Sequence, residues 1–334
     1  MNSIEPKRFF CTYFDQGYLP RALAMYHSLV RHCPSFTLWI LCLDDDCYET
    51  LVKMSLPHIE IISLKDFEHG DKALQQAKQN RSRVEYYFTC TPSLPLFILK
   101  HHPTVGLITY LDADLYFFSE LDSIYDEIAD NSIAIIPHLF TPNMKHREVH
   151  GIYNVGWVTF RRDANGLACL QWWRERCIEW CYDRIEPERF ADQKYLDKFS
   201  IHFDGVIALK HKGANLAPWN LGNYTVLEDG MQIKIDEYPL VFYHFHSFKR
   251  LNPWLYNTAL GDYQVRPSQI VKKEIYAPYI NSLNQVSMSS PYRPKTRRSR
   301  VWGIEQIRNI KGITQMIKDI LLGRFIFIIS GQIF

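Results

Sequence analysis

The sequence lacks several features that would assign it to a specialised class of protein. Its eight cysteines include no Cys-x-x-Cys pair, so the chain shows no sign of a zinc ribbon or a thioredoxin-type centre. No apolar run approaches the roughly 18 residues that a membrane-spanning helix needs, and residues 1–8 contain no apolar segment typical of a signal peptide. A formal net charge of +2 gives no reason to expect a nucleic-acid partner. We therefore expect a cytoplasmic chain with reduced thiols.

The residues that are present favour a large α/β fold. The chain has 334 residues, of which 47% are hydrophobic, enough for one large domain or two smaller ones. Apolar runs of strand length alternate with helical patterns in its first third, which is the rhythm of a parallel sheet. We expect strands at residues 9–14, 37–43, 59–62, 106–111, 132–137, 154–160, 205–209 and 240–246, and helices at 21–31, 71–80, 96–101, 121–129 and 168–184, with another beginning at 191.

Two aspartates follow the central strand of this pattern. Asp112 and Asp114 lie one residue apart after residues 106–111, so both carboxylates can converge on one point. Two such carboxylates repel each other, and Mn²⁺ or Mg²⁺, which prefers oxygen ligands, relieves that repulsion. The alternative is an acidic turn that caps a helix, since Asp122 follows closely. An Asp-x-Asp pair also opens the phosphatases that form a phosphoaspartate, but these normally carry Thr or Val where this chain has Tyr116.

Two histidines on the strand expected at 240–246 are candidates for the same metal. Strand alternation places His244 and His246 on one face. A single histidine on an apolar strand is commonly a structural core residue. For a pair beside a candidate metal site, we expect at least one of the two to be a ligand.

Other charged groups allow two interpretations. Asp44, Asp45 and Asp46 precede a helix and are read first as its cap and only second as a ligand cluster, because carboxylates favour the positive end of the helix dipole. Arg81 and Arg83 follow the helix expected at 71–80. They are either solvated residues that suit the negative end of that dipole or ligands for a phosphate.

The order of these motifs resembles the GT-A glycosyltransferases of family 8, the relatives of glycogenin and of the bacterial lipopolysaccharide galactosyltransferases. The likeness covers about residues 9–254 and depends on the ordered set of motifs. That set comprises Leu111-Asp112-Ala113-Asp114, Asn154-Val155-Gly156, Ala191-Asp192-Gln193 and a histidine-bearing strand followed by Pro253-Trp254. The resemblance implies a GT-A, Rossmann-like domain over residues 1–286, with a mostly parallel central sheet flanked by helices and followed by a C-terminal helical extension.

The resemblance also implies a metal site. Asp112 and Asp114 would bind Mn²⁺, or Mg²⁺, together with the diphosphate of a sugar nucleotide, and a UDP-sugar is favoured. The family's spacing between its metal-binding histidine and Pro-Trp selects His246. Its spacing between that histidine and a phosphate-binding lysine selects His244 with Arg250 instead, because position 252 is asparagine. The third ligand therefore stays open between the two histidines.

Further residues acquire expected roles through the same resemblance. Three lie near the transferred sugar and would act in catalysis: Asn154, Asp192 and Gln193. The others would bind the donor: Thr12 and Tyr13 at the base, Asp112 at the ribose with Ala113 beside it, Arg81 or Arg83 as a basic residue, and Lys249 or Arg250 at the phosphate.

The function that the resemblance implies is transfer of a sugar from a nucleotide donor to a saccharide or a lipid-linked glycan. The metal and a basic side chain would stabilise the leaving diphosphate. The reaction would retain the anomeric configuration through front-face attack, or through Asp192 as a nucleophile. The alternatives are an inverting GT-A transferase, a non-catalytic scaffold that binds glycans or membranes, and a sugar-nucleotide phosphohydrolase. We expect the loops 138–153 and 212–224 to select the substrates.

The C-terminal residues differ in composition from the rest. Residues 287–300 are rich in Ser, Pro and basic residues and are read as a linker. Residues 301–334 form an amphipathic tail, in which residues 302–322 carry isoleucines at helical intervals with interspersed Lys and Arg. Such a helix suits either the surface of an anionic membrane, which would place the protein peripherally on the inner face of the membrane, or docking on the catalytic domain.

Overall fold

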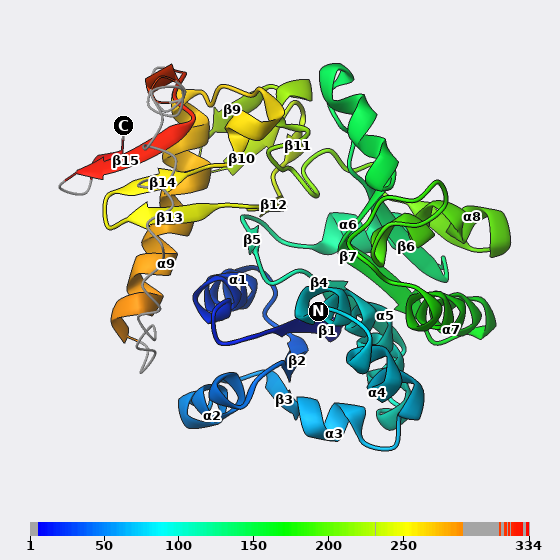
Figure 1. Cartoon of the computed structure of the whole chain (residues 1–334). Coiled ribbons are helices and arrows are strands. Elements are labelled where there is room, and N and C mark those ends of the chain that lie inside the picture. The colour runs from blue at the N-terminus through cyan, green and yellow to red at the C-terminus, as the bar shows by residue number, and fades with distance from the viewer. Residues whose placement is uncertain are drawn as a thin grey trace, which may run out of the picture.

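A seven-stranded sheet in the order β3-β2-β1-β4-β7-β6-β8 forms the centre of this computed structural model (Figure 1). The structure describes residues 6–230, 232–289, 314, 317–318, 320, 322–329 and 332–333. Its strands are β1 (Arg8–Phe14), β2 (Phe36–Cys42), β3 (Ile59–Ser63), β4 (Leu107–Leu111), β6 (Ile133–Pro137), β7 (Tyr153–Arg161) and β8 (Val206–Ala208). Neighbouring strands pair in parallel except at β7, which is antiparallel to both β4 and β6. The predicted α/β class with a mostly parallel sheet is confirmed.

Helices cover both faces of the sheet. One face packs against α1 (Leu19–His32), α2 (Asp45–Met54) and α6 (Asp122–Ile128). The other face packs against α3 (Leu64–Glu68), α4 (Lys72–Gln79), α5 (Arg83–His101), α7 (Ala164–Glu179) and α8 (Phe199–His202). On β1, Phe10 belongs to the first core and its neighbour Cys11 to the second, as strand alternation requires. All eight cysteines are buried and none forms a disulfide.

The three consecutive aspartates begin a helix, as predicted. Asp44 is the N-cap of α2, and its Oδ1 accepts a hydrogen bond of 2.8 Å from the Cys47 amide. Asp45 and Asp46 occupy the first turn, where their charge complements the helix dipole.

Helix α5 is the largest departure from the sequence prediction, which began a helix only at residue 96. It begins at Arg83 behind a capping box, in which Ser82 and Glu85 accept hydrogen bonds from each other's backbone amides. Pro92 and Pro95 lie inside the helix, although each removes a backbone donor. The helix tolerates them because this part of it is buried between the sheet and α7.

Three other elements differ from their expected bounds. Helix α7 spans Ala164–Glu179 where 168–184 was predicted. It begins early because Asp163 caps it, accepting a hydrogen bond from the Gly166 amide at 2.8 Å. The element expected from residue 191 is a 3₁₀ helix, η2 (Gln193–Lys198). The strand expected at 240–246 is only β12 (Phe242–His244), which pairs with the short β5 (Leu115–Phe117).

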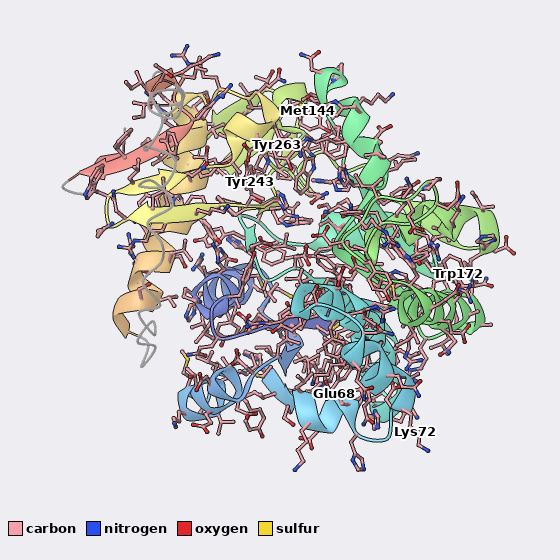
Figure 2. All side chains as sticks on the ribbon, in the orientation of Figure 1. Glu68, Lys72, Met144, Trp172, Tyr243 and Tyr263 are labelled. Atoms are coloured by element: carbon pink, nitrogen blue, oxygen red, sulfur yellow. The ribbon has the colours of Figure 1, made fainter. Side chains whose placement is uncertain are left out.

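The second half of the chain adds smaller elements beyond the central sheet. They are the 3₁₀ helices η1 (Pro142–His150), η3 (Leu221–Asn223) and η4 (Leu260–Tyr263), the π-helix η5 (Val271–Tyr276), α9 (Ala277–Ser289), and strands β9 (Val226–Asp229), β10 (Gln232–Ile235), β11 (Tyr238–Pro239), β13 (Lys249–Asn252), β14 (Leu255–Asn257), β15 (Phe325–Ile329) and β16 (Gln332–Ile333). Met144 and Tyr263 lie at the same end of the molecule (Figure 2) and share a small core cluster with Trp219, which places η1 against η4.

The C-terminal residues are described only in part. Helix α9 continues to Ser289, so the first three residues of the predicted linker are helical. The basic run at 295–300 and most of the amphipathic tail lie outside the described residues. Strand β15 pairs with β14, which joins this end of the chain to the rest of the fold (Figure 1). No described helix has the length and hydrophobicity needed to cross a bilayer.

Candidate metal centre

The two aspartates of the Asp-x-Asp motif lie at the turn between β4 and β5. The Asp112 amide donates to the Gly156 carbonyl on β7 at 3.0 Å, and the Leu115 amide donates back to the Asp112 carbonyl at 3.3 Å. These bonds close a tight turn at the C-terminal end of β4, the edge at which open α/β sheets bind ligands. Neither carboxylate caps a helix: α6 begins after Leu121, with no side-chain hydrogen bond at its cap. The capping alternative for Asp112 and Asp114 is therefore wrong.

The antiparallel pair of β12 and β5 brings His244 to the same place. His244 pairs with Leu115, and the next amide, that of Phe245, donates to the Asp114 carbonyl at 2.9 Å. The His244 Nε2 lies 3.1 Å from the Asp114 Oδ1 and 3.6 Å from the Asp112 Oδ2. One ligand atom from each of these three residues lies within 4.8 Å of the other two.

Asn154 on β7 orients the His244 ring. Its Oδ1 accepts a hydrogen bond from the Gly156 amide at 2.9 Å and lies 3.2 Å from the His244 Nδ1. The bond from Gly156 identifies this atom as the amide oxygen, which can only accept, so the Nδ1 carries the proton and donates to it. The Nε2 that faces the two carboxylates is therefore the atom that would bind a metal. Without a metal these carboxylates, against the effect of burial, raise the pKa of His244.

The electrostatics of the centre match a cation. Burial raises the pKa of Asp112 to about 6, although the nearby His244 opposes this shift. Burial would also raise the pKa of Asp114, but the interaction with His244 lowers it to about 2. Two carboxylates and an imidazole are a donor set that divalent Mn²⁺ accepts, and buried carboxylates of this kind are usually paired with a cation. The residues present fit a divalent metal.

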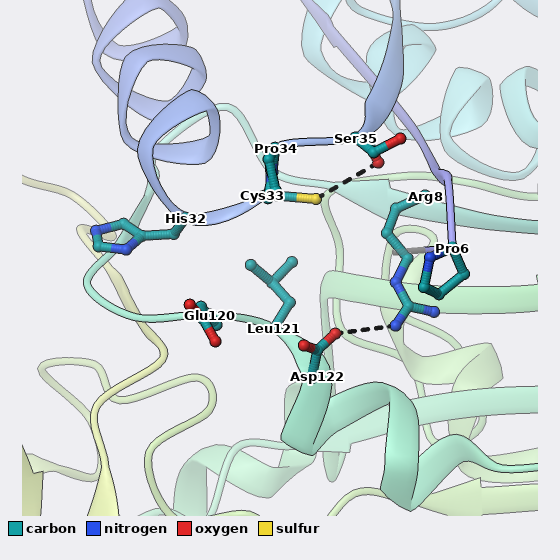
Figure 3. Close-up of a pocket in the computed structure, with 9 residues that line it drawn as sticks. All are labelled: Pro6, Arg8, His32, Cys33, Pro34, Ser35, Glu120, Leu121 and Asp122. Atoms are coloured by element: carbon teal, nitrogen blue, oxygen red, sulfur yellow. Dashed lines mark hydrogen bonds and ion pairs between the residues drawn. The ribbon is translucent and has the colours of Figure 1, made fainter. Parts of the chain in front are cut away.

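The cluster lies at the wall of a cavity of about 800 Å³, large enough for a sugar nucleotide. A second depression, formed around Arg8, Cys33 and Asp122, has a volume of only about 20 Å³ (Figure 3). That is room for about one water molecule. There the Arg8 Nη2 donates to the Asp122 Oδ1 at 3.0 Å, which makes this depression a structural ion-pair site.

Most predicted site residues line the large cavity: Tyr13, Arg83, Asp112, Ala113, Asp114, Asn154, Asp192, Gln193, His244 and His246. Four others are absent from its walls: Thr12, Arg81, Lys249 and Arg250. Thr12 is fully buried within β1. Arg81 donates from its Nη2 to the Ile178 carbonyl at 2.8 Å, so it stabilises the contact with α7. Of the two arginines, only Arg83 reaches the cavity.

The two basic residues of β13 are not lining residues of the cavity. Arg250 donates from its Nε to the Asn252 carbonyl at 3.4 Å, within its own hairpin, and its guanidinium lies 6.0 Å from the Tyr256 ring. Lys249 is exposed on the same strand. Neither side chain lines the large cavity, although the charge of Lys249 acts on His246 in its wall.

Asp192 and Gln193 line the cavity, and Gln193 contacts the loop 138–153. The Gln193 Nε2 donates to the His150 carbonyl at 3.1 Å, and its Oε1 lies 3.4 Å from the Asn154 Nδ2. Burial, with a contribution from Asp112, raises the pKa of Asp192 to about 7. Its Oδ2 is buried without a hydrogen-bond partner among the described residues.

His246 lines the cavity but does not join the three-residue cluster. It lies beyond the end of β12, with ring centroids 6.0 Å from His244 and 5.5 Å from Trp219. Burial and the charge of His244 lower its pKa to about 4, so it is neutral at physiological pH. The geometry favours His244 as the third ligand.

Sequence analysis did not predict two residues of the cavity wall as site residues. Tyr18, just before α1, points its hydroxyl at the Asp114 Oδ2 at a distance of 3.4 Å. Its position after the first strand of a parallel sheet was a usable signal. Arg147 is on η1, within the loop 138–153 that was predicted only to select substrates. One cation in a loop of mixed polar residues carries no spacing signal.

Comparison with solved structures defines the fold class. No protein-family model matches the chain. The galactosyltransferase LgtC, solved in complex with donor and acceptor sugar analogs, aligns with a TM-score of 0.52 and 15% identity over 87% of this chain and 99% of LgtC. The structure of an active-site mutant of LgtC aligns over the same shares of both chains, with a TM-score of 0.52 and 13% identity. Fold and site together define a GT-A glycosyltransferase fold that resembles family 8.

Sequence comparison identifies the family within that class. "Uncharacterized protein YfnD" of Bacillus subtilis (strain 168) is 32% identical over 279 residues, which span 83% of this chain and 88% of YfnD. "Uncharacterized protein YfnF" of the same organism is 30% identical over 248 residues, 72% of this chain and 81% of YfnF. The chain belongs to the family of these two proteins.

Proposed function

We propose that this protein is a metal-dependent glycosyltransferase that moves a sugar from a nucleoside diphosphate to an acceptor hydroxyl. The observation that carries the proposal is the cluster of Asp112, Asp114 and His244 at the wall of a large cavity. The same cavity offers polar groups for the sugar, including the unpartnered Asp192 Oδ2. The GT-A fold agrees with this chemistry.

Each residue of the cavity has a role that follows from its position. Asp112, Asp114 and the His244 Nε2 would hold Mn²⁺ or Mg²⁺, which supplies positive charge to the donor's diphosphate. Asn154 keeps His244 in the tautomer that this binding requires. Tyr13 and Tyr18 provide aromatic surface near the carboxyl end of β1, where a base such as uracil would lie.

Transfer breaks the bond between the anomeric carbon and the phosphate oxygen. The electron pair of that bond stays on the oxygen of the departing nucleoside diphosphate. The acceptor oxygen forms the new bond to the anomeric carbon, and its proton passes to the leaving diphosphate. Below pH 7 the Asp192 carboxyl is neutral in the metal-free cavity, which suits a hydrogen-bond donor to a sugar hydroxyl better than a nucleophile. We therefore favour front-face attack, with retention of configuration.

The acceptor is a saccharide or a lipid-linked glycan in this proposal. The loop around η1 and the loop before η3 both contribute residues to the cavity, among them Phe140 and Trp219. Aromatic surfaces of this kind stack on sugar rings. In this proposal the basic run at 295–300 and the tail that follows attach the protein to an anionic membrane surface.

A thermal-shift panel tests the proposal. The purified protein is heated with UDP-, GDP-, ADP- and TDP-sugars, with and without Mn²⁺, and the unfolding midpoint is recorded. We expect one donor to raise the midpoint only when Mn²⁺ is present, and Asp114→Ala to remove the shift. Product analysis with and without candidate acceptors then separates transfer from hydrolysis. A chain that binds no sugar nucleotide would contradict the proposal and favour a scaffold.

A further inference from the structure

The cavity is rich in carboxylates, and one of its two arginines is already engaged. The acidic residues that line it are Asp15, Asp112, Asp114 and Asp192, and its arginines are Arg83 and Arg147. Arg83 forms an ion pair with Asp15, and its Nε donates to the Tyr87 hydroxyl at 2.7 Å. A diphosphate entering this cavity therefore meets uncompensated negative charge unless cations balance it.

Arg147 is the remaining arginine of the cavity wall. None of the ion pairs within residues 6–230 and 232–289 includes Arg147, and its Nε is buried without a hydrogen-bond partner there. Its Nη2 donates to the Asp262 carbonyl at 3.4 Å, near the outer limit for a hydrogen bond. Its guanidinium lies 4.8 Å from the Tyr263 ring centroid, which holds it at the cavity wall. No described carboxylate therefore neutralises the charge of this guanidinium.

A chain of ring contacts connects Arg147 to the metal cluster. Tyr263 lies 6.2 Å from Trp219 between ring centroids, and Trp219 lies 5.1 Å from His244. Figure 2 shows Tyr263 at the same end of the molecule as Met144 of η1. The guanidinium is therefore fixed on the His244 side of the cavity by a packed wall.

We propose that Arg147 binds the diphosphate of the donor from the cavity wall beside His244, taking the role that the family resemblance assigned to a basic residue of β13. This inference rests on the proposed function. A guanidinium binds two phosphate oxygens at once, so it stabilises the diphosphate both when bound and when it leaves. The asparagine at position 252 is consistent with this shift, because the lysine expected there from the resemblance is missing.

Calorimetric titration with nucleotides tests the assignment. UDP, GDP, ADP and CDP are titrated into the wild type and Arg147→Gln in the presence of Mn²⁺, each beside its nucleoside monophosphate. We expect Arg147→Gln to weaken the preferred diphosphate about 10- to 100-fold, as loss of a charged hydrogen-bonding partner does. The monophosphate should lose far less. Arg147→Met, which keeps the apolar stem against Tyr263, should give the same result if the Gln variant does not fold.

The matched control is Arg266→Gln, which removes the same charge from an exposed arginine that does not line the cavity. It should bind both classes of nucleotide as the wild type does. Wild-type binding with unchanged diphosphate affinity in both Arg147 variants would overturn this inference alone. The inference would also be overturned if the Arg147 variants lost affinity equally for monophosphate and diphosphate. A selective loss of diphosphate affinity in Arg250→Gln, and not in the Arg147 variants, would overturn it too. A wild type that binds none of the four diphosphates would overturn the donor site and this inference with it.

Discussion

The Asp192 carboxyl is buried in the cavity, and burial raises its pKa to about 7 from an ordinary value of 3.8. Between these two pH values the unfolded chain releases this proton while the folded chain keeps it. The unfolded state then binds fewer protons, so the free energy of unfolding falls as pH rises through this range and levels off above it. Ionisation of Asp192 therefore lowers the free energy of unfolding, fully near pH 8 and not at all near pH 3.

Replacing Asp192 by asparagine tests this cost. The amide has the shape of the protonated carboxyl and its hydrogen-bonding groups but cannot ionise. We expect Asp192→Asn to raise the metal-free free energy of unfolding at pH 8 by on the order of a few kcal/mol, with little change at pH 4, and to lower transfer activity. Urea unfolding at both pH values measures the difference. Equal stability of the two proteins at pH 8 would contradict the raised pKa.

At the scale of elements, residues from three strands and their ends form the metal centre. The turn after β4 supplies the aspartates, β12 supplies His244, and β7 supplies the asparagine that orients it. Gly156 on β7 lets the side chains of Asn154 and His244 lie this close to the backbone of β7. A Cβ at Gly156 would lie 2.5 Å from the Asn154 Oδ1 and 2.8 Å from the His244 Nδ1, which is closer than real contacts allow.

Gly156→Ala should therefore displace His244 and its asparagine. We expect Mn²⁺ affinity to fall by about 10- to 100-fold, the usual effect of disturbing the groups that orient a metal ligand. Gly106→Ala is the matched control, because a Cβ there meets nothing within 4 Å and the residue precedes β4. Manganese titration followed by electron paramagnetic resonance compares the two. Equal affinities would show that Gly156 does not govern the site.

The sequence predicted this site well where a local pattern carried the information. The order of strands, the Asp-x-Asp turn and the Ala-Asp-Gln segment are local signals. The residues of the turn and of the segment line one cavity in the structure. The choice between His244 and His246 depended on the register of β12 against β5, which no local pattern encodes. The start of α5 was missed because prolines mask a helix that tertiary packing stabilises.

At the scale of the whole molecule, the end of the chain is tied to the domain by β15. The Thr258 hydroxyl donates to the Arg324 carbonyl at 2.6 Å, and Ile326 is fully buried in the core that contains Tyr243 and Tyr256. That core also supports β12, the strand that carries His244. Residues 322–329 therefore contribute to the stability of the fold that positions the site.

Ile326→Ala should lower the free energy of unfolding by about 2–4 kcal/mol, because it removes a buried side chain and leaves a cavity. Ile317→Ala provides the comparison, since this isoleucine is 48% exposed and its loss should change stability by less than about 0.5 kcal/mol. Chemical denaturation of both variants gives the two values. Similar stabilities would mean that β15 is not part of the cooperative core.

An anomalous difference map from crystals soaked in Mn²⁺ and UDP tests the central claim most directly. The account predicts one strong manganese peak among the carboxylates of Asp112 and Asp114 and the His244 Nε2, with the diphosphate between that peak and Arg147. A manganese peak elsewhere in the cavity, or bound UDP with these three side chains free of metal, would contradict the account.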